Sequence, residues 1–462
     1  MTGAAVTTGG TAPMTTLGFA DEIEASFQQG VAYLNDHLWE GEHFTLELTA
    51  EQSQFTRLNH AKVRQTGIVA DGNLDLTLMA NERRSFRTFP LTGDRALDTS
   101  HITEALQSLR NELPQLPPDP YLVLPRGSNT SRDAYAGTLL PSDQIAMELL
   151  TPVADLDFTG IYAGGTIIRG YADSAGQLHW FATASFTLDY SIFTADGQAV
   201  KGTVAGRNWN PDDYQAKLTD SRKQLERMAV EPKAIAPGSY RTYLAPAAVA
   251  ELISMLSWGG VSEASLQKGD SALNRLRRGE ATLSPQFVLK ENFSQGLVPR
   301  FNDIGEVAPL SLTVIEQGQL CNSLISARTA KEYGLASNGA AGWEGLRSPD
   351  VSPGTLATPD ILKALDTGLY LSNLHYLNWS DRPTGRITGM TRYACFWVEN
   401  GNIVAPIENL RFDDSLYQFF GEQLVALTDQ AEFIPEVGSY ERREIGGTWT
   451  PGILVDQFAY TL

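Results

Sequence analysis

The pattern of apolar and polar positions changes period along the chain, and each period predicts a kind of element. Apolar side chains recur at helical spacing near the N-terminus, at Phe19, Ile23, Phe27, Val31, Leu34 and Leu38. Strict alternation from Leu74 to Met79, directly behind Asp71-Gly72, predicts a strand that follows a hairpin turn. A second helical stripe over Ser100–Leu113 completes an order of helix, strands and helix. This order is typical of an α+β layer.

A second group of strands follows a break. Six prolines fall between Pro114 and Pro141, and we interpret this segment as a surface connection packed over the sheet. The strands predicted next are Gly165–Tyr171, His179–Tyr190 and Val200–Val204, with turns at Ser174-Ala175-Gly176 and Asp196-Gly197. A charged helix is predicted over Asp212–Val230, and Pro232–Gly238 is the expected linker.

The C-terminal half is organised around one apolar helix and one long β stretch. Pro246 fits the first turn of a helix, and Ala247–Trp258 is apolar on nearly all faces, so we expect it to be buried. The β stretch, residues 368–413, predicts strands over Leu369–Tyr376, Tyr393–Val398 and Ile403–Ile407, a polar loop over Ser380–Gly385 and a tight turn at Asn400-Gly401.

Together these patterns predict an α+β protein. Residues 1–18 are expected to be a disordered tail, and residues 19–235 an N-terminal α/β layered domain of antiparallel hairpins with helices. Residues 236–462 are expected to form a β-rich C-terminal domain around the buried helix.

Charge and composition exclude several classes of protein. The chain has 462 residues, with Lys+Arg 35 against Asp+Glu 54, a net charge of −19. An acidic surface repels phosphate, which disfavours nucleic-acid binding and binding to anionic membranes. We find no targeting segment and no run of about 18 apolar residues, so a cytoplasmic protein without a membrane span is expected. Cys321 and Cys395 are predicted to be reduced and buried.

The familiar catalytic motifs are missing from the sequence. It has no nucleophile elbow, no phosphate-binding P-loop and no dinucleotide fingerprint. No two of its six histidines are four or five residues apart, so no helical pair of metal ligands is present. Cys395 and His375 as a nucleophile pair is disfavoured, because each lies alone on a predicted buried strand.

Several longer motifs resemble those of one family. They are Gly368-Leu-Tyr-Leu-Ser-Asn, Gly385-Arg-Ile-Thr-Gly-Met and Val398-Glu-Asn-Gly-Asn-Ile, with Tyr243-Leu-Ala-Pro, Asn302-Asp-Ile-Gly and Thr313-Val-Ile-Glu-Gln-Gly before them. In these stretches the chain resembles the TldD/PmbA family, named for metallopeptidases and for modulators of DNA gyrase. The resemblance covers residues 240–462 closely and residues 20–235 more weakly.

The resemblance also implies a degenerate catalytic site. Catalytic members carry a helical His-Glu-x-x-x-His pair of zinc ligands and a late cysteine, with the Glu handling the proton of a zinc-bound water. The corresponding positions here are Ser254 and Gly259 for the two histidines, Met255 for the Glu, and Ser439 or its neighbour for the cysteine. All three ligands and the base are therefore absent, and we expect the chain alone to be inactive and to hold no metal.

We therefore expect a non-catalytic, TldE/PmbA-like subunit of a TldD-type peptidase complex that degrades or trims unfolded peptides and peptide precursors. Zinc would lie in the catalytic partner. Peptide would bind by strand addition at exposed edges, with contacts from Trp379, Arg382 and Arg386 in the predicted loop region. The rival interpretation of the two arginines is that they are solvated hairpin charges. The alternative function is a stand-alone homodimeric protein that binds peptide or acts as a scaffold without proteolytic activity.

Overall fold

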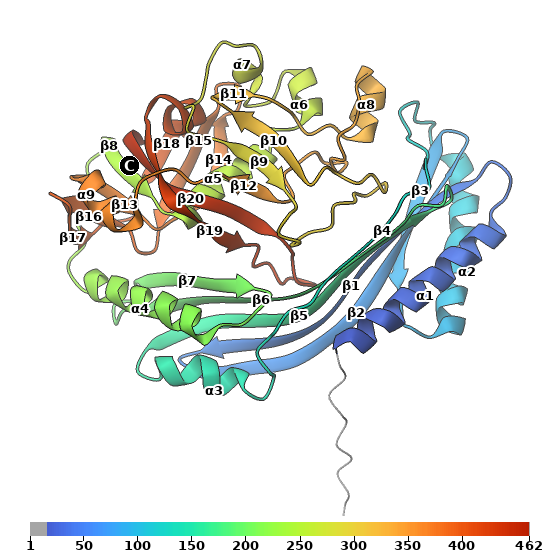
Figure 1. Ribbon diagram of the computed structural model, residues 1–462, viewed down its shortest axis with the longest axis horizontal. Coiled ribbons are helices and arrows are strands. Elements are labelled where there is room, and N and C mark those ends of the chain that lie inside the picture. The colour runs from blue at the N-terminus through green and yellow to red at the C-terminus, as the bar shows by residue number, and fades with distance from the viewer. Residues whose placement is uncertain (1–15, 462) are drawn as a thin grey trace, which may run out of the picture.

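The structure is a computed structural model, and it describes residues 16–461. Its strands form two sheets, one of seven strands and one of thirteen (Figure 1). The first sheet is long and curved, and the second lies over part of its concave side. The α+β prediction is confirmed. Of the predicted tail, residues 1–15 lie outside the described residues, and Thr16–Gly18 belong to the first helix.

The first sheet uses the strands that precede residue 207. These strands are β1 (His43–Asn59), β2 (Lys62–Ala80), β3 (Arg83–Pro90), β4 (Thr130–Tyr135), β5 (Asp157–Asp173), β6 (Leu178–Phe193) and β7 (Ala199–Gly206). Their order is β3-β2-β1-β5-β6-β4, with β7 also paired to β6. All pairs are antiparallel except β4 with β6.

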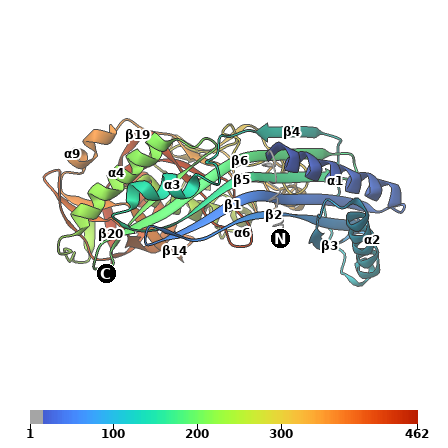
Figure 2. The same ribbon diagram turned by 90° about the horizontal axis from the view of Figure 1, so that it is seen from below.

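Four α-helices cover the convex face of this sheet at its two ends (Figure 2). The helices α1 (Thr16–His37) and α2 (Arg95–Glu112) bury one end, where Phe27 packs with Leu46, Leu76 and Ile102. The helices α3 (Ile145–Leu150) and α4 (Pro211–Met228) bury the other. Between residues 16 and 461 no helix is long and apolar enough to cross a membrane.

The second sheet and its helices follow residue 237. The strands are β8 (Gly238–Leu244), β9 (Leu289–Asn292), β10 (Ser311–Glu316), β11 (Gln319–Leu320), β12 (Pro349–Val351), β13 (Gly368–Leu371), β14 (Asn373–Asp381), β15 (Arg386–Arg392), β16 (Phe396–Glu399), β17 (Asn402–Pro406), β18 (Arg411–Ser415), β19 (Leu424–Pro435) and β20 (Gly447–Tyr460). The helices are α5 (Pro246–Ser257), α6 (Glu263–Lys268), α7 (Asn274–Arg277), α8 (Ala327–Tyr333) and α9 (Ile361–Leu365). The largest core cluster of the molecule surrounds α5.

Side chains from both halves join the two sheets. Ala394 and Phe396 of the second half lie in one apolar cluster with Phe158, Tyr190 and Tyr214 of the first. The two halves are thus fastened by shared core as well as by polar contacts. The predicted domain bounds at residues 235 and 236 stay a prediction.

Two turns differ from the prediction. Asp71-Gly72 lies inside β2, and the hairpin turns are His60-Ala61 and Asn81-Glu82, whose φ angles are all positive, between 47° and 59°. Gly72 serves close packing instead, since a Cβ there would lie 3.2 Å from the Cβ of Ala50. By contrast, the turn at Asn400-Gly401 is confirmed, with φ angles of 51° and 73°.

The burial of one of the two thiols also differs from the prediction. Cys395 is buried, but Cys321 is exposed. Cys321 directly follows the short edge strand β11, which pairs with β10 alone, so little protein covers it.

Candidate functional site

The helix α5 is the central element of the second half. Pro246 occupies its first turn, and eight of its residues are buried in the core, which confirms the predicted buried helix. Its exposed positions are Glu251 and Ser254, and the exposed Trp258 follows its end. Because these positions are three or four residues apart, they form one open stripe along the helix, defined here as the α5 stripe.

The four positions at which the family resemblance places the lost catalytic groups have different surroundings. Ser254 lies on the α5 stripe, and its hydroxyl donates to the carbonyl of Glu251 at 2.7 Å. Met255 is 3% exposed and points into the core. Gly259 follows the helix with a φ of +108°. Ser439 lines a groove on the first sheet, with residues of β1, β2 and β5.

The hairpin of β14 and β15 holds the end of α5. The indole N–H of Trp379 donates to the carbonyl of Trp258 at 2.6 Å, which satisfies a carbonyl left free at the helix end. A Cβ on Gly259 would lie 3.0 Å from Nε of Arg382, so the guanidinium covers this glycine. Two of the three predicted peptide contacts therefore lie together at the C-terminal end of α5.

The third predicted contact, Arg386, is engaged elsewhere. Its guanidinium donates to Oδ1 of Asp413 at 2.9 Å and to the Asp413 carbonyl at 2.9 Å, across the pair of β15 and β18. Within residues 16–461, Arg382 makes no comparable hydrogen bond. The geometry thus leaves Arg382 as the freer of the two cations, and the binding roles of all three residues stay predictions.

Charges from both halves surround the α5 stripe. Protein atoms flank Glu251 although its side chain reaches solvent, and this burial raises the pKa of its carboxyl, with a further rise from Glu436. Lys201 on β7 opposes that rise, so it lies within electrostatic reach of the stripe. The ammonium of Lys201 is held 3.0 Å from Oδ2 of Asp189 on β6. The stripe therefore faces a polar space between the sheets.

The strand β14 offers a free edge beside α5. It pairs with β15 alone, and its register is interrupted between His375 and Asn378. Tyr376 stands at this bulge with a φ of +54° and a side chain that is 74% exposed. An exposed, bulged edge strand is a place where an extended peptide can add.

The residues present do not fit a zinc ion. Of the four positions, two offer a hydroxyl, one a thioether inside the core and one no donor, whereas protein zinc sites use thiolate, imidazole and carboxylate. Across the described part of the chain, no three His, Cys, Asp or Glu side chains are grouped so that they could hold a metal ion. We therefore derive no chemical step through a metal on this chain.

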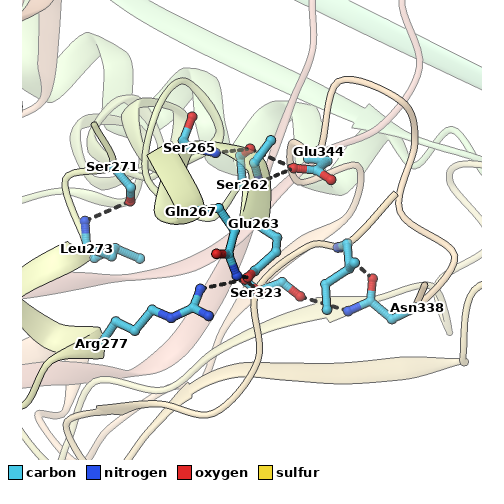
Figure 3. A network of polar contacts seen from close by, with 12 residues as sticks. Ser262, Glu263, Ser265, Gln267, Ser271, Leu273, Arg277, Ser323, Asn338 and Glu344 are labelled. Atoms are coloured by element: carbon cyan, nitrogen blue, oxygen red, sulfur yellow. Dashed lines mark hydrogen bonds and ion pairs between the residues drawn. The ribbon is translucent and has the colours of Figure 1, made fainter. Parts of the chain in front are cut away.

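Two polar networks escaped the sequence analysis. In the first, Glu344 accepts from the Ser262 hydroxyl at 2.7 Å, from the Ala264 N–H at 2.8 Å and from the Ser326 N–H at 2.8 Å, so it caps α6 and α8 together (Figure 3). Beside it, Glu263 accepts from Arg277 at 2.7 Å. These contacts fix the segments that follow α5.

The second network fastens the loop after β19 to the first sheet. The buried Arg443 donates its N–H to Glu51 at 3.2 Å and its guanidinium to the Ser185 hydroxyl at 3.0 Å. The local sequence of this loop does not indicate that Arg443 is buried. The positive φ of Glu344, +55°, likewise has no signal in the sequence.

Comparisons with known proteins show which proteins share this architecture. The family model of the PmbA/TldA metallopeptidase C-terminal domain matches residues 237–461. Three solved structures share the fold over nearly the whole chain. TldE from Thermococcus kodakarensis is 13% identical, with a TM-score of 0.74 over 96% of this chain and 100% of its own. No curated protein sequence matches the chain.

The other two structures are described as candidate modulators of DNA gyrase. The one from Thermotoga maritima is 16% identical, with a TM-score of 0.71 over 97% of this chain and 100% of its own. The one from Bacteroides thetaiotaomicron is 17% identical, with a TM-score of 0.74 over 96% of this chain and 99% of its own. At these identities the likeness establishes the fold.

The fold and the matched domain define a metallopeptidase-related protein built from two sheets, the second of which surrounds a buried helix. Residues 237–461 match the PmbA/TldA metallopeptidase C-terminal domain, as the motifs of the chain indicated.

Proposed function

We propose that this chain is a non-catalytic, TldE/PmbA-like subunit that pairs with a TldD-type zinc peptidase. The complex would degrade or trim unfolded peptides and peptide precursors. The observation that carries the proposal is the retained scaffold around α5, in which the positions of the lost groups supply a hydroxyl, a core thioether and a glycine. Zinc would be bound by the partner, whose own residues would supply the ligands.

The role of this chain would be to hold substrate. An extended peptide could pair its backbone with the free edge of β14, which needs no particular side-chain sequence. Arg382 stands at the end of that strand, and among residues 16–461 its guanidinium packs over Gly259 without a hydrogen-bond partner, where it suits an acidic side chain or a peptide carboxylate. The charges around the α5 stripe would keep the space between the two sheets polar.

The deciding experiment starts from the native cell. The tagged chain is purified with whatever co-elutes, the partners are identified by mass spectrometry, and zinc and peptidase activity are measured for the complex and for the chain alone. We expect a metal-bearing sibling with a His-Glu-x-x-x-His helix, and activity in the complex only. Peptide cleavage by the isolated chain with stoichiometric zinc would refute the proposal.

Substrate holding is tested separately in the same complex. Arg382→Ala should weaken the binding of an unfolded acidic peptide several-fold, measured by fluorescence anisotropy. The matched control is Lys223→Ala on α4, a cation whose side chain is 61% exposed and which pairs only with Asp220. Equal weakening by both variants would indicate general charge attraction and would remove Arg382 from the site.

The same purification separates the alternative function. If no peptidase sibling co-elutes, and the isolated chain is a homodimer that binds unfolded peptide without cleaving it, the stand-alone binding protein is the better account.

A further inference from the structure

Part of the strand β2 has a free edge, and this free edge is limited at both ends. The strand β3 pairs with β2 only from Asn73 onward, and the carbonyl of Gly72 accepts from the N–H of Leu91. At the other end, the register of β1 with β2 shifts between Arg57 and Leu58, which leaves Arg64 bulged. The regular free edge therefore runs over residues 65–71, and every residue from 62 to 70 is exposed.

The backbone groups of this edge are ready to pair. Since the Gly72 carbonyl points away from β1, the residues of β2 with the same parity also point outward. These residues are Thr66, Ile68 and Ala70, and Ile68 lies at the middle of the free edge. In the described structure their outward N–H and C=O groups meet no other strand.

We propose that this edge, residues 65–71 of β2, is where a second copy of the chain adds its own β2 in antiparallel fashion about a two-fold axis through Ile68. An isologous interface requires a surface that complements itself. Antiparallel pairing joins outward residues to outward residues, so Ile68 faces its mate and Thr66 faces Ala70. A shift of the register by two residues would bring the bulge at Arg64 or the end of β3 into the contact and shorten the regular pairing, so the geometry favours this register.

The side chains agree with this register. Ile68 is 70% exposed in the single chain, and two copies would cover each other at the axis. Gln65 would face Asp71 of the partner copy at both ends, an amide donor against a carboxylate. Arg64 directly precedes Gln65, so a cation approaches the same carboxylate. The segment 65–71 holds a single charged side chain, which limits repulsion between two chains of net charge −19.

The surroundings extend the contact beyond the strand itself. A groove of about 530 Å³ opens beside the edge, lined by Phe55, Ile68, Val69 and Tyr440 among others. The side chain of Tyr440 is 93% exposed at its rim. A stable dimer of standard size buries about 800 Å² on each partner, more than a seven-residue strand provides, and the groove with Tyr440 supplies adjoining apolar surface. The proposal does not depend on any peptidase role.

The test uses the full chain and its solution mass. Light scattering after gel filtration should give twice the mass of one chain at micromolar concentration. Ile68→Lys would set two ammonium groups against each other at the axis and should weaken the dimer at least tenfold. The matched control is Val404→Lys, because Val404 is 50% exposed on β17, an edge strand of the other sheet, and it should leave the dimer unchanged.

A crosslink tests the register by the formation of a covalent dimer and not by the loss of the dimer. Hydrogen-bonded antiparallel neighbours have Cα atoms about 5.5 Å apart, which lies within the Cα range that a disulfide spans, although their Cβ atoms stand wider apart than those of non-hydrogen-bonded pairs. In a Cys321→Ser background, Ile68→Cys should therefore form a disulfide-linked dimer on mild oxidation, and Val404→Cys should not. A monomeric wild-type chain, or a dimer that Ile68→Lys leaves intact, would overturn the proposal. So would an unfolded peptide that binds the monomer and is lost in Ile68→Lys, because the edge would then serve substrate.

Discussion

At the scale of single residues, the buried charges are the costliest part of this fold. Arg443 is 3% exposed and Glu51 is 2% exposed, and both come from segments almost four hundred residues apart in sequence. The Ser53 hydroxyl bridges them, since it accepts from Arg443 at 3.4 Å and donates to Glu51 at 2.8 Å. Burial lowers the pKa of Arg443 to about 10, while the charge of Glu51 acts in the opposite direction.

The two members of this pair should therefore contribute non-additively to stability. Arg443→Met removes the buried guanidinium near Glu51 and its hydrogen bonds to the Ser53 and Ser185 hydroxyls, and we expect a loss of about 3–5 kcal/mol in the free energy of unfolding. The double variant with Glu51→Gln should lose less than the sum of the two single changes. Denaturant unfolding gives the free energy of unfolding of the wild type, the two single variants and the double variant. The control Arg278→Met breaks a pair whose side chains are 56% and 51% exposed, and it should leave the free energy of unfolding nearly unchanged, because solvent screens the pair.

Glu291 should make the stability depend on pH. Burial raises its pKa from 4.5 to about 7, with its hydrogen bonds to Arg347 and Ser348 acting in the opposite direction. Between pH 4.5 and about 7 the folded state holds a proton that the unfolded state has released, so stability falls as the pH rises through this window. Over that window the loss amounts to about 3 kcal/mol.

The variant Glu291→Gln should remove that slope and leave the chain more stable than wild type above pH 7. Its amide oxygen can still accept from the N–H groups of Arg347 and Ser348, as Oε1 of Glu291 does. The measurement is the difference between the two curves of unfolding free energy against pH. The exposed Glu40→Gln serves as control, and a difference curve for Glu291→Gln as flat as that of the control would contradict the assignment.

At the scale of elements, a turn-forming residue pair did not always make a turn, because the pairing of the flanking strands decides where the chain reverses. Asn400-Gly401 makes the expected turn, but Asp71-Gly72 lies within β2, where Gly72 is needed for its small size against Ala50. The helix Ala327–Tyr333 is bounded by local signals, a Ser cap and a glycine end. The strand β20 depends on more than local signals, since it pairs with β8, which lies some two hundred residues earlier in the chain.

Glu344 offers a test of how two short helices are held. Neither α6 nor α8 is long enough to be stable alone, and one carboxylate caps both. Glu344→Ala removes three hydrogen bonds from one buried and two half-buried donors and should cost about 3 kcal/mol, whereas Glu344→Gln keeps one oxygen and should cost about half as much. Hydrogen exchange should report faster opening of both helices together. Loss of protection in only one helix would show that the two caps are independent.

At the scale of the whole molecule, the sequence identified the family and the altered positions, but not their arrangement in space. The motifs around Gly368 and Asn400 were enough to indicate the family whose C-terminal domain matches residues 237–461. What they could not reveal is that Met255 faces the core, that Ser439 lines a groove on the first sheet, or that Arg386 is bound to Asp413. These facts depend on packing between segments that are far apart in the chain, which no local pattern records.

The shared core predicts that the two halves do not fold independently. Ala394 and Phe396 are 1% and 0% exposed, and they share one apolar cluster with Tyr190, Tyr214 and Phe158 from the first half. A fragment of residues 237–461 would expose this cluster to water, together with the unpaired Arg443, and lose both its apolar burial and its polar partners. We expect the full chain to unfold in one calorimetric transition, and the fragment to bind a hydrophobic dye and show no sharp transition.

The variant Phe396→Ala in the full chain isolates the apolar part of this joint and should cost about 3–5 kcal/mol. If the fragment instead melts cooperatively at the temperature of the full chain, the contacts between the halves are accessory, and the second sheet carries its own stability. Because α5 and the free edge of β14 both lie in that half, such a result would also mean that peptide holding can be studied on the fragment alone.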